Sequence, residues 1–136
     1  MTLNEFRIKH SHLIEHYQFI EVHLEGIYAS LSGNFFEGLQ EVDRDSILRI
    51  LHKIQAVSRE KGIEVLSPDQ VSTLQEINKR RNFWCHSCYF ELAFGTKSGP
   101  KKAADVQHLI DDLKQAEILR ESLFARKTEL MRSASL

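Results

Sequence analysis

The sequence has little of what marks secreted or membrane-spanning proteins. It contains only two cysteines, Cys85 and Cys88, so a disulfide framework of the kind that staples small secreted domains is excluded. No apolar run approaches the roughly 18 residues that a membrane-spanning helix needs. Residues 1–9 lack the apolar core and the small-residue cleavage site of a signal peptide. We therefore expect a cytoplasmic protein without a membrane partner.

Helix-breaking residues are also scarce, because only 2 prolines and 6 glycines occur in 136 residues. That length fits one domain, and a composition of 42% hydrophobic and 27% charged residues is typical of a globular chain. Neither an internal repeat nor a low-complexity segment is present. The chain is therefore expected to form a single domain over residues 1–136.

Apolar residues recur at helical spacing along most of the chain. We expect helices over about 4–31, 43–62 and 67–95, and from about 103 to near the C-terminus. Gly33 and Asn34 are expected to end the first helix, and Asp43 and Ser67 are the expected N-caps of the next two. In the first helix the apolar positions advance in steps of four and three, as in a bundle seam: Leu13, Tyr17, Ile20, Leu24, Ile27 and Leu31. The sequence thus predicts an all-α fold, an up-and-down bundle of four or five helices.

The third expected helix is apolar on two sides. With about 100° of rotation per residue, one face holds the expected core stripe. This stripe comprises Val71, Leu74, Ile77, Cys85, Cys88 and Leu92. Phe83, Phe90 and Phe94 lie on the opposite side. Because a surface helix of a small bundle needs only one apolar face, we expect a homodimer with these three phenylalanines in its interface.

Positive charge is concentrated in one segment although the net charge is −1. Residues 79–102 hold six basic residues against one acidic residue, a local charge of +5, so the remaining residues carry −6. Besides Arg81, the basic residues are Lys79, Arg80, Lys97, Lys101 and Lys102. Such a local excess is typical of a surface that binds nucleic-acid phosphates, so these five are the predicted RNA-binding residues.

Three polar residues, Arg81, Asn82 and His86, interrupt the apolar pattern of the same helix. An unpaired guanidinium is costly to bury, so Arg81 must reach a cleft, a carboxylate or an anion. The imidazole of His86 is suited to proton transfer near neutral pH. A straight α-helix separates Arg81 and His86 by about 140°, whereas two copies across a dimer axis can assemble a cleft with two arginines and two histidines.

The segment from Arg81 to His86 resembles the R-x4–6-H motif of the HEPN superfamily. An asparagine follows the arginine, three residues separate it from the histidine, and the segment lies in an expected helix. The resemblance implies a dimeric bundle of four or five helices, a single HEPN-like domain, and an endoribonuclease of the toxin–antitoxin or phage-defence kind. It implies that Arg81 and His86 are catalytic and that Asn82 supports them. The implied reaction is RNA transesterification by the 2′-hydroxyl, which requires neither metal nor cofactor. An antitoxin or another regulatory protein is an expected partner besides RNA.

Other interpretations remain open at this stage. The chain is alternatively a non-catalytic helical dimer that binds RNA or a protein, with Arg81 paired to Asp111 or Asp112 of the next helix. Residues 12–16 fit the H-x-x-E-H pattern of inverted zinc peptidases but offer no third ligand. The C-x-x-C of Cys85 and Cys88 lies in mid-helix, where buried thiols are expected rather than a redox or metal site. Residues 95–102 form a basic interhelical loop whose glycine spacing does not match a phosphate-binding loop.

Overall fold

The computed structural model describes residues 1–95 and 98–134, which form an all-α bundle. Its elements are α1 (Leu3–Leu31), α2 (Phe35–Glu41), α3 (Ile47–Lys61), α4 (Pro68–Asn82), the π-helical turn η1 (Phe83–Ser87), α5 (Cys88–Glu91) and α6 (Ala103–Ala134). The predicted fold class is confirmed. Among the described residues, none of the helices combines the length and the apolar character that a bilayer crossing requires.

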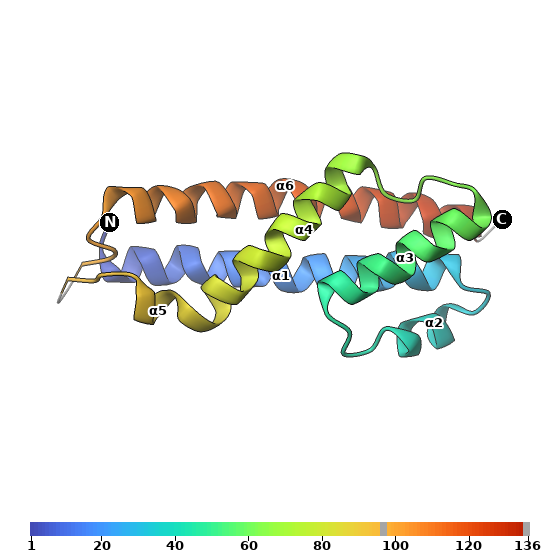
Figure 1. Cartoon of the computed structure of the whole chain (residues 1–136), viewed down its shortest axis with the longest axis horizontal. Coiled ribbons are helices and arrows are strands. Elements are labelled where there is room, and N and C mark those ends of the chain that lie inside the picture. The colour runs from blue at the N-terminus through green and yellow to red at the C-terminus, as the bar shows by residue number, and fades with distance from the viewer. Residues whose placement is uncertain (96–97, 135–136) are drawn as a thin grey trace.

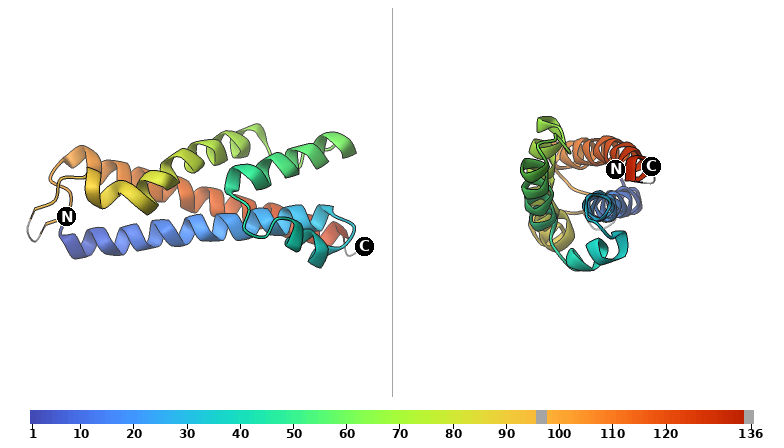
Figure 2. Two further views of the ribbon diagram at one scale, coloured as in Figure 1. Left: turned by 60° about the horizontal axis from the view of Figure 1, so that its bottom comes forward. Right: turned by 90° about the vertical axis from the view of Figure 1, so that its right-hand side faces the viewer.

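The two longest helices, α1 and α6, lie side by side along the molecule (Figure 1). Hydrogen bonds join His16 of α1 to Arg120 of α6, and His23 of α1 to Lys127 of α6. Residue numbers therefore increase in the same direction along both helices, so the pair is parallel. Two further helices, α3 and α4, cover one side of this pair, and α4 runs in the opposite direction (Figure 2). With the short α2 as the return between α1 and α3, successive helices alternate in direction, as in an up-and-down bundle.

Local sequence signals set most helix ends. Ser67 is the N-cap of α4, as predicted, and it forms a capping box with Gln70, while a proline takes the first helical position. A second capping box, formed by Thr2 and Glu5, begins α1. Gly62 ends α3 with a φ of 67°, a left-handed conformation that glycine adopts without strain. These ends follow from side-chain chemistry that is visible in the sequence.

Two predicted boundaries between α1 and α3 are wrong. The side chain of Asn34 accepts a hydrogen bond from the N–H of Glu37, so Asn34 begins α2, a helix that none of the expected ranges contains. The N-cap of α3 is Ser46 and not Asp43, because the Ser46 hydroxyl accepts a hydrogen bond from the N–H of Arg49. Serine and aspartate are equally good N-caps, so residue type alone did not decide between them.

The core lies between α1, α6 and the inner sides of α3 and α4. The predicted seam of α1 is buried along its whole length. Trp84 and Tyr17 are among the largest fully buried side chains, and the hydroxyl of Tyr17 has no hydrogen-bond partner within the described residues. Because full burial of a leucine-sized side chain contributes roughly 1.5–3 kcal/mol, this seam holds α1 firmly against the other helices. The long helix α1 is therefore anchored in the core through this seam.

Candidate functional site

Residues 81–86 lie where α4 passes into the π-helical turn η1. The prediction of one α-helix over residues 67–95 is wrong in detail, because α-helical structure stops at Asn82, η1 follows, and α5 ends at Glu91. In a π turn each N–H bonds to the carbonyl five residues back instead of four, so residues five apart come nearer to one face. The angle of about 140° between Arg81 and His86 in a straight α-helix is thereby reduced.

Arg81 is held by a carboxylate of α1. Its Nη2 lies 2.6 Å from Oε1 of Glu21, and the two side chains are 34% and 22% exposed. Burial raises the pKa of Glu21, and the positive charge of Arg81 opposes that shift. The ion pair therefore lies at the margin of the core, where the guanidinium still reaches solvent.

Asp112 of α6 binds Arg80 and not Arg81. Its Oδ2 lies 2.7 Å from Nε of Arg80 and accepts a second hydrogen bond, of 2.6 Å, from the indole N–H of Trp84. Asp111 instead accepts a hydrogen bond from a glutamine amide of its own helix. Both partners considered for Arg81 are therefore wrong. Arg80, a predicted RNA contact, is engaged within the chain and ties α4 to α6.

Asn82 and His86 are exposed, and neither side chain makes a hydrogen bond or ion pair to another described residue. The three motif residues thus share one short segment of surface. Of the three, Arg81 has an ion-pair partner among the described residues.

The predicted phosphate-binding residues are only partly brought together. Lys79, Lys101 and Lys102 are exposed. The backbone N–H of Lys101 donates a 2.6 Å hydrogen bond to the carbonyl of Ala93, which places the start of the α6 segment beside the end of α5. Lys97 lies outside the described residues. The exposed lysines therefore flank the segment that carries the motif on both sides in sequence.

The three phenylalanines predicted for a dimer interface have different surroundings. Phe83 packs against Trp84 with 4.7 Å between ring centres, and Phe94 packs edge-on against Phe6 at 5.1 Å. Both are half-buried within their own chain. Phe90 is 92% exposed. The second apolar side of the helix is thus partly covered by the same chain. Of the three phenylalanines, Phe90 alone is almost fully exposed to solvent.

The core stripe predicted for this helix is right except at one position. Leu74, Ile77 and Cys88 are buried, Val71 and Leu92 are half-buried, and Cys85 is exposed. Trp84, one residue earlier, enters the core instead of Cys85. Partial loss of solvent around the thiol raises the pKa of Cys85, and burial raises the pKa of Cys88 to about 11, so both are protonated at neutral pH. Protonated thiols are poor nucleophiles and poor metal ligands, which argues against a redox or zinc role for this pair.

The H-x-x-E-H pattern on α1 gains no support as a zinc site. Its second histidine, His16, accepts a 3.2 Å hydrogen bond from Nη1 of Arg120 through Nδ1. Within residues 1–95 and 98–134, no group of three or more histidine, cysteine, aspartate or glutamate side chains is arranged to hold a metal ion.

Two residues of α1 contact the motif segment and were not singled out from the sequence. One is Glu21, the partner of Arg81. The other is His10, whose Nε2 donates a 2.7 Å hydrogen bond to the carbonyl of Trp84. A signal for His10 was present, because the seam that begins at Leu13 extends backward in steps of three and four to His10 and Phe6. A polar residue at a seam position is a reason to expect a specific partner.

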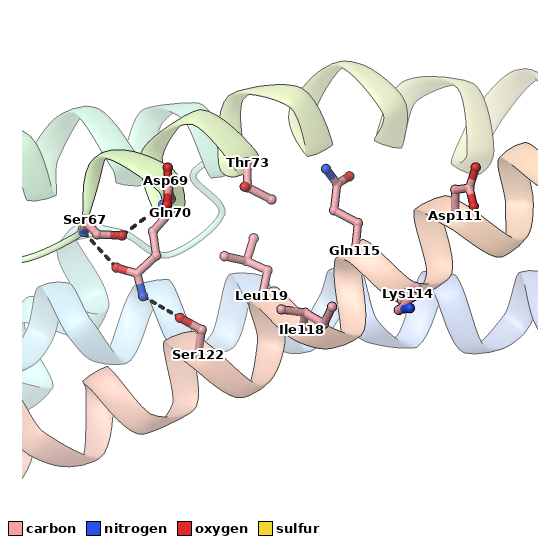
Figure 3. A pocket seen from close by; sticks show the side chains of 10 residues that line it. All are labelled: Ser67, Asp69, Gln70, Thr73, Asp111, Lys114, Gln115, Ile118, Leu119 and Ser122. Carbon is pink, nitrogen blue, oxygen red and sulfur yellow. Dashed lines mark hydrogen bonds between the residues drawn. The ribbon is translucent and has the colours of Figure 1, made fainter.

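A cleft of about 460 Å³ lies between α4 and α6 (Figure 3). Its lining combines the apolar side chain of Leu119 with amide and hydroxyl groups, among them Gln70, whose amide donates a 2.6 Å hydrogen bond to Ser122. A second, more polar cleft continues from it toward Arg80. Residues 81–86 line neither cleft, so the motif lies on the open surface beyond their end.

In comparisons with known proteins, no family model, no curated protein and no solved structure matches the chain.

Proposed function

We propose that this chain is a metal-independent endoribonuclease of the HEPN kind, acting on RNA in the cytoplasm as a homodimer. The observation that carries the proposal is the placement of Arg81 near the end of α4 and of His86 within the π-helical turn that follows, both accessible to solvent. π turns inside α-helices occur frequently at functional sites. Glu21 holds the arginine, while the side chain of His86 is exposed to solvent.

The chemistry proposed for this site is transesterification. The 2′-hydroxyl of RNA attacks the adjacent phosphorus, the bond to the 5′-oxygen breaks, and a 2′,3′-cyclic phosphate and a 5′-hydroxyl form. His86 removes the proton from the 2′-hydroxyl or delivers one to the leaving oxygen. Arg81 stabilises the negative charge that develops on the phosphorane oxygens, and Asn82 orients His86 or a phosphate oxygen.

One histidine cannot act as base and acid in the same step, which is the reason for proposing a dimer. A second copy of the chain supplies a second His86 and a second Arg81 across the axis, so that the two roles are divided between protomers. Phe90 is the contact proposed for this interface, because so large an exposed aromatic surface is costly in water. Exposed Lys79, Lys101 and Lys102 bind flanking phosphates without reading sequence.

The resemblance also suggests a biological setting for the activity. An endoribonuclease of this kind is proposed to serve as a toxin or as a phage-defence component, with an antitoxin or another regulatory protein as its partner. Such a partner is needed because an exposed, preorganised nuclease site is harmful to the cell that makes it.

A second candidate function is a non-catalytic helical dimer that binds RNA or a protein. The ion pair between Arg81 and Glu21 favours it, because a carboxylate 2.6 Å away competes with a phosphate for the guanidinium. The exposure of His86 favours the enzyme, because an acid–base residue must be accessible to its substrate.

Variants of the two motif residues test the proposal. Replacing His86 with alanine is expected to reduce RNA cleavage by about 10²–10⁴-fold, the range typical of an acid–base residue, while the exposed position leaves the melting temperature unchanged. Arg81→Lys is also expected to fail, because a single ammonium does not reproduce the planar donors of a guanidinium. His52→Ala, at an exposed histidine of α3, is the matched control. Cleavage at the wild-type rate by His86→Ala would remove the motif from the mechanism and favour the non-catalytic module.

A further inference from the structure

The π turn that carries His86 creates a hydrogen-bonding problem for its own backbone. A π turn has backbone hydrogen bonds between residues five apart, whereas an α-helix has them between residues four apart. Where the first pattern changes to the second, a backbone carbonyl is left without an amide partner. Trp84 is the second residue of this turn, and its side chain is buried. A carbonyl in such a place needs a donor from outside the helix, because water reaches it poorly.

His10 of α1 supplies that donor. Its Nε2 lies 2.7 Å from the Trp84 carbonyl oxygen, a short and well-formed hydrogen bond. The thiol of Cys88 also donates to this oxygen, at 3.5 Å, but a thiol is a weak donor. Of these two side-chain donors the imidazole is the stronger, although it is 74 residues away in sequence.

The imidazole of His10 is itself held in place by rings. It stacks on Phe6 with 5.8 Å between ring centres and an interplanar angle of 9°. Tyr89 meets it edge-on at 5.5 Å, and Trp84 lies tilted at 6.3 Å. Phe6 is fully buried, so this arrangement is anchored in the core. The ring is thereby aimed at the carbonyl rather than free to rotate away from it.

We infer that His10 is a positioning residue that holds the π turn and thereby sets His86 relative to Arg81. This inference rests on the proposed function for its catalytic consequence but not for its structural one. α1 then contacts the segment twice, through Glu21 on the side of Arg81 and through His10 on the side of His86. Without the second contact the turn relaxes toward α-helical bonding, which separates Arg81 and His86 by up to about 140° again.

Two substitutions separate the hydrogen bond from the space that the ring fills. His10→Leu keeps an apolar body in the ring cluster and removes the donor. His10→Gln retains an N–H donor of similar reach. His12→Leu, at an exposed position two residues later on α1, is the matched control. Circular dichroism of each variant shows whether the bundle itself is intact.

The first readout is amide hydrogen exchange of residues 84–92, measured without RNA. We expect faster exchange in His10→Leu, near-wild-type exchange in His10→Gln, and no change in His12→Leu. Wild-type exchange in a folded His10→Leu would overturn the inference. Because this measurement involves no RNA, its result stands whether or not the protein is a ribonuclease.

The second readout is RNA cleavage, and it tests the catalytic consequence. His10→Leu is expected to lower kcat by about 10- to 100-fold with little change in KM, since a displaced catalytic group costs that much. His10→Gln is expected to recover most of the loss. A kcat that stays at the wild-type level in His10→Leu, or a loss that His10→Gln does not recover, would overturn the positioning role. Absence of cleavage by the wild type would instead overturn the proposed function, and the exchange experiment would still decide the structural claim.

Discussion

Two histidines of α1 that contact α6, His16 and His23, make the stability of this bundle depend on pH. His23 is only 6% exposed, and its Nδ1 accepts a 2.9 Å hydrogen bond from Nζ of Lys127. Burial lowers the pKa of His23 to about 4, and the positive charges of Lys127 and Arg120 add to the effect. The pKa of His16 is lowered in the same way, first by burial and then by Arg120. The fold therefore requires neutral imidazoles along this contact.

The sign of the effect on stability follows from the direction of this shift. Between pH 6.5 and about 4 the unfolded chain protonates at His23 whereas the folded chain does not. The contribution of His23 to the free energy of unfolding is therefore complete above pH 6.5 and decreases as the pH falls toward 4, by at most about 1.4 kcal/mol per pH unit.

We predict that His23→Asn, which keeps an acceptor for Lys127, flattens this pH dependence. The measurement is urea unfolding at several values between pH 7 and pH 5. His52→Asn, at an exposed histidine of α3, is the control and should leave the dependence as in the wild type. Equal pH dependence in His23→Asn and the wild type would show that His23 is not responsible.

At the scale of elements, residues that follow α5 lie beside residues that precede α6. Phe94 pairs with Pro100 in an isolated bridge, and the N–H of Lys101 donates a hydrogen bond to the carbonyl of Ala93. Lys101 and Lys102 are exposed to solvent. They are therefore accessible for the phosphate contacts that we propose.

Neutralising both lysines, as Lys101→Gln with Lys102→Gln, is predicted to weaken RNA binding and to flatten its salt dependence. Each lost phosphate contact with single-stranded RNA lowers the slope of log K against log salt by about 0.7. Arg59→Gln with Lys61→Gln, at the end of α3 and at the opposite end of the molecule, is the control (Figure 1). Filter binding over a range of salt concentrations measures the RNA affinity and its salt dependence for each variant. An unchanged slope in the first variant would exclude these lysines from the RNA-binding surface.

Several elements were predictable from the sequence because the signals that define them are local. The seam of α1, the capping box at Ser67 and the terminating glycine at Gly62 depend only on residues a few positions apart. The short α2 was missed because Asn34 serves both as a turn residue and as an N-cap. Local chemistry therefore determines these ends, and it is ambiguous where one residue type suits two roles.

The π turn and the partners of the motif were not predictable in the same way. Residue types place Arg81 and His86 in one helix, but the change to π bonding depends on contacts with α1, which is distant in sequence. The pairing of Arg81 with Glu21, and of Asp112 with Arg80, is set by how the helices are placed in the bundle. Periodicity in the sequence shows which face of each helix is buried. It does not show how far the helix is shifted along its axis relative to its neighbours, and this shift decides which side chains meet.

At the scale of the whole molecule, the bundle leaves one large aromatic side chain almost fully in water. Phe90 is 92% exposed and lies one helical turn after His86. If it belongs to a dimer interface, Phe90→Glu is predicted to produce monomers without loss of helicity. Phe36→Glu, at a phenylalanine that is 77% exposed on α2, is the matched control and should remain dimeric. Analytical ultracentrifugation at micromolar concentration distinguishes the two, and a wild-type protein that sediments as a monomer would contradict the dimer.

The measurement that tests the central claim most directly is an RNA cleavage assay with end-group analysis of the products in the presence of EDTA. Purified protein is incubated with mixed RNA, and the product termini are identified. The account predicts cleavage that EDTA does not inhibit, with 2′,3′-cyclic phosphates and 5′-hydroxyls at the new ends. Cleavage that is lost in EDTA and restored by a divalent metal, or products that carry 5′-phosphates, would contradict it.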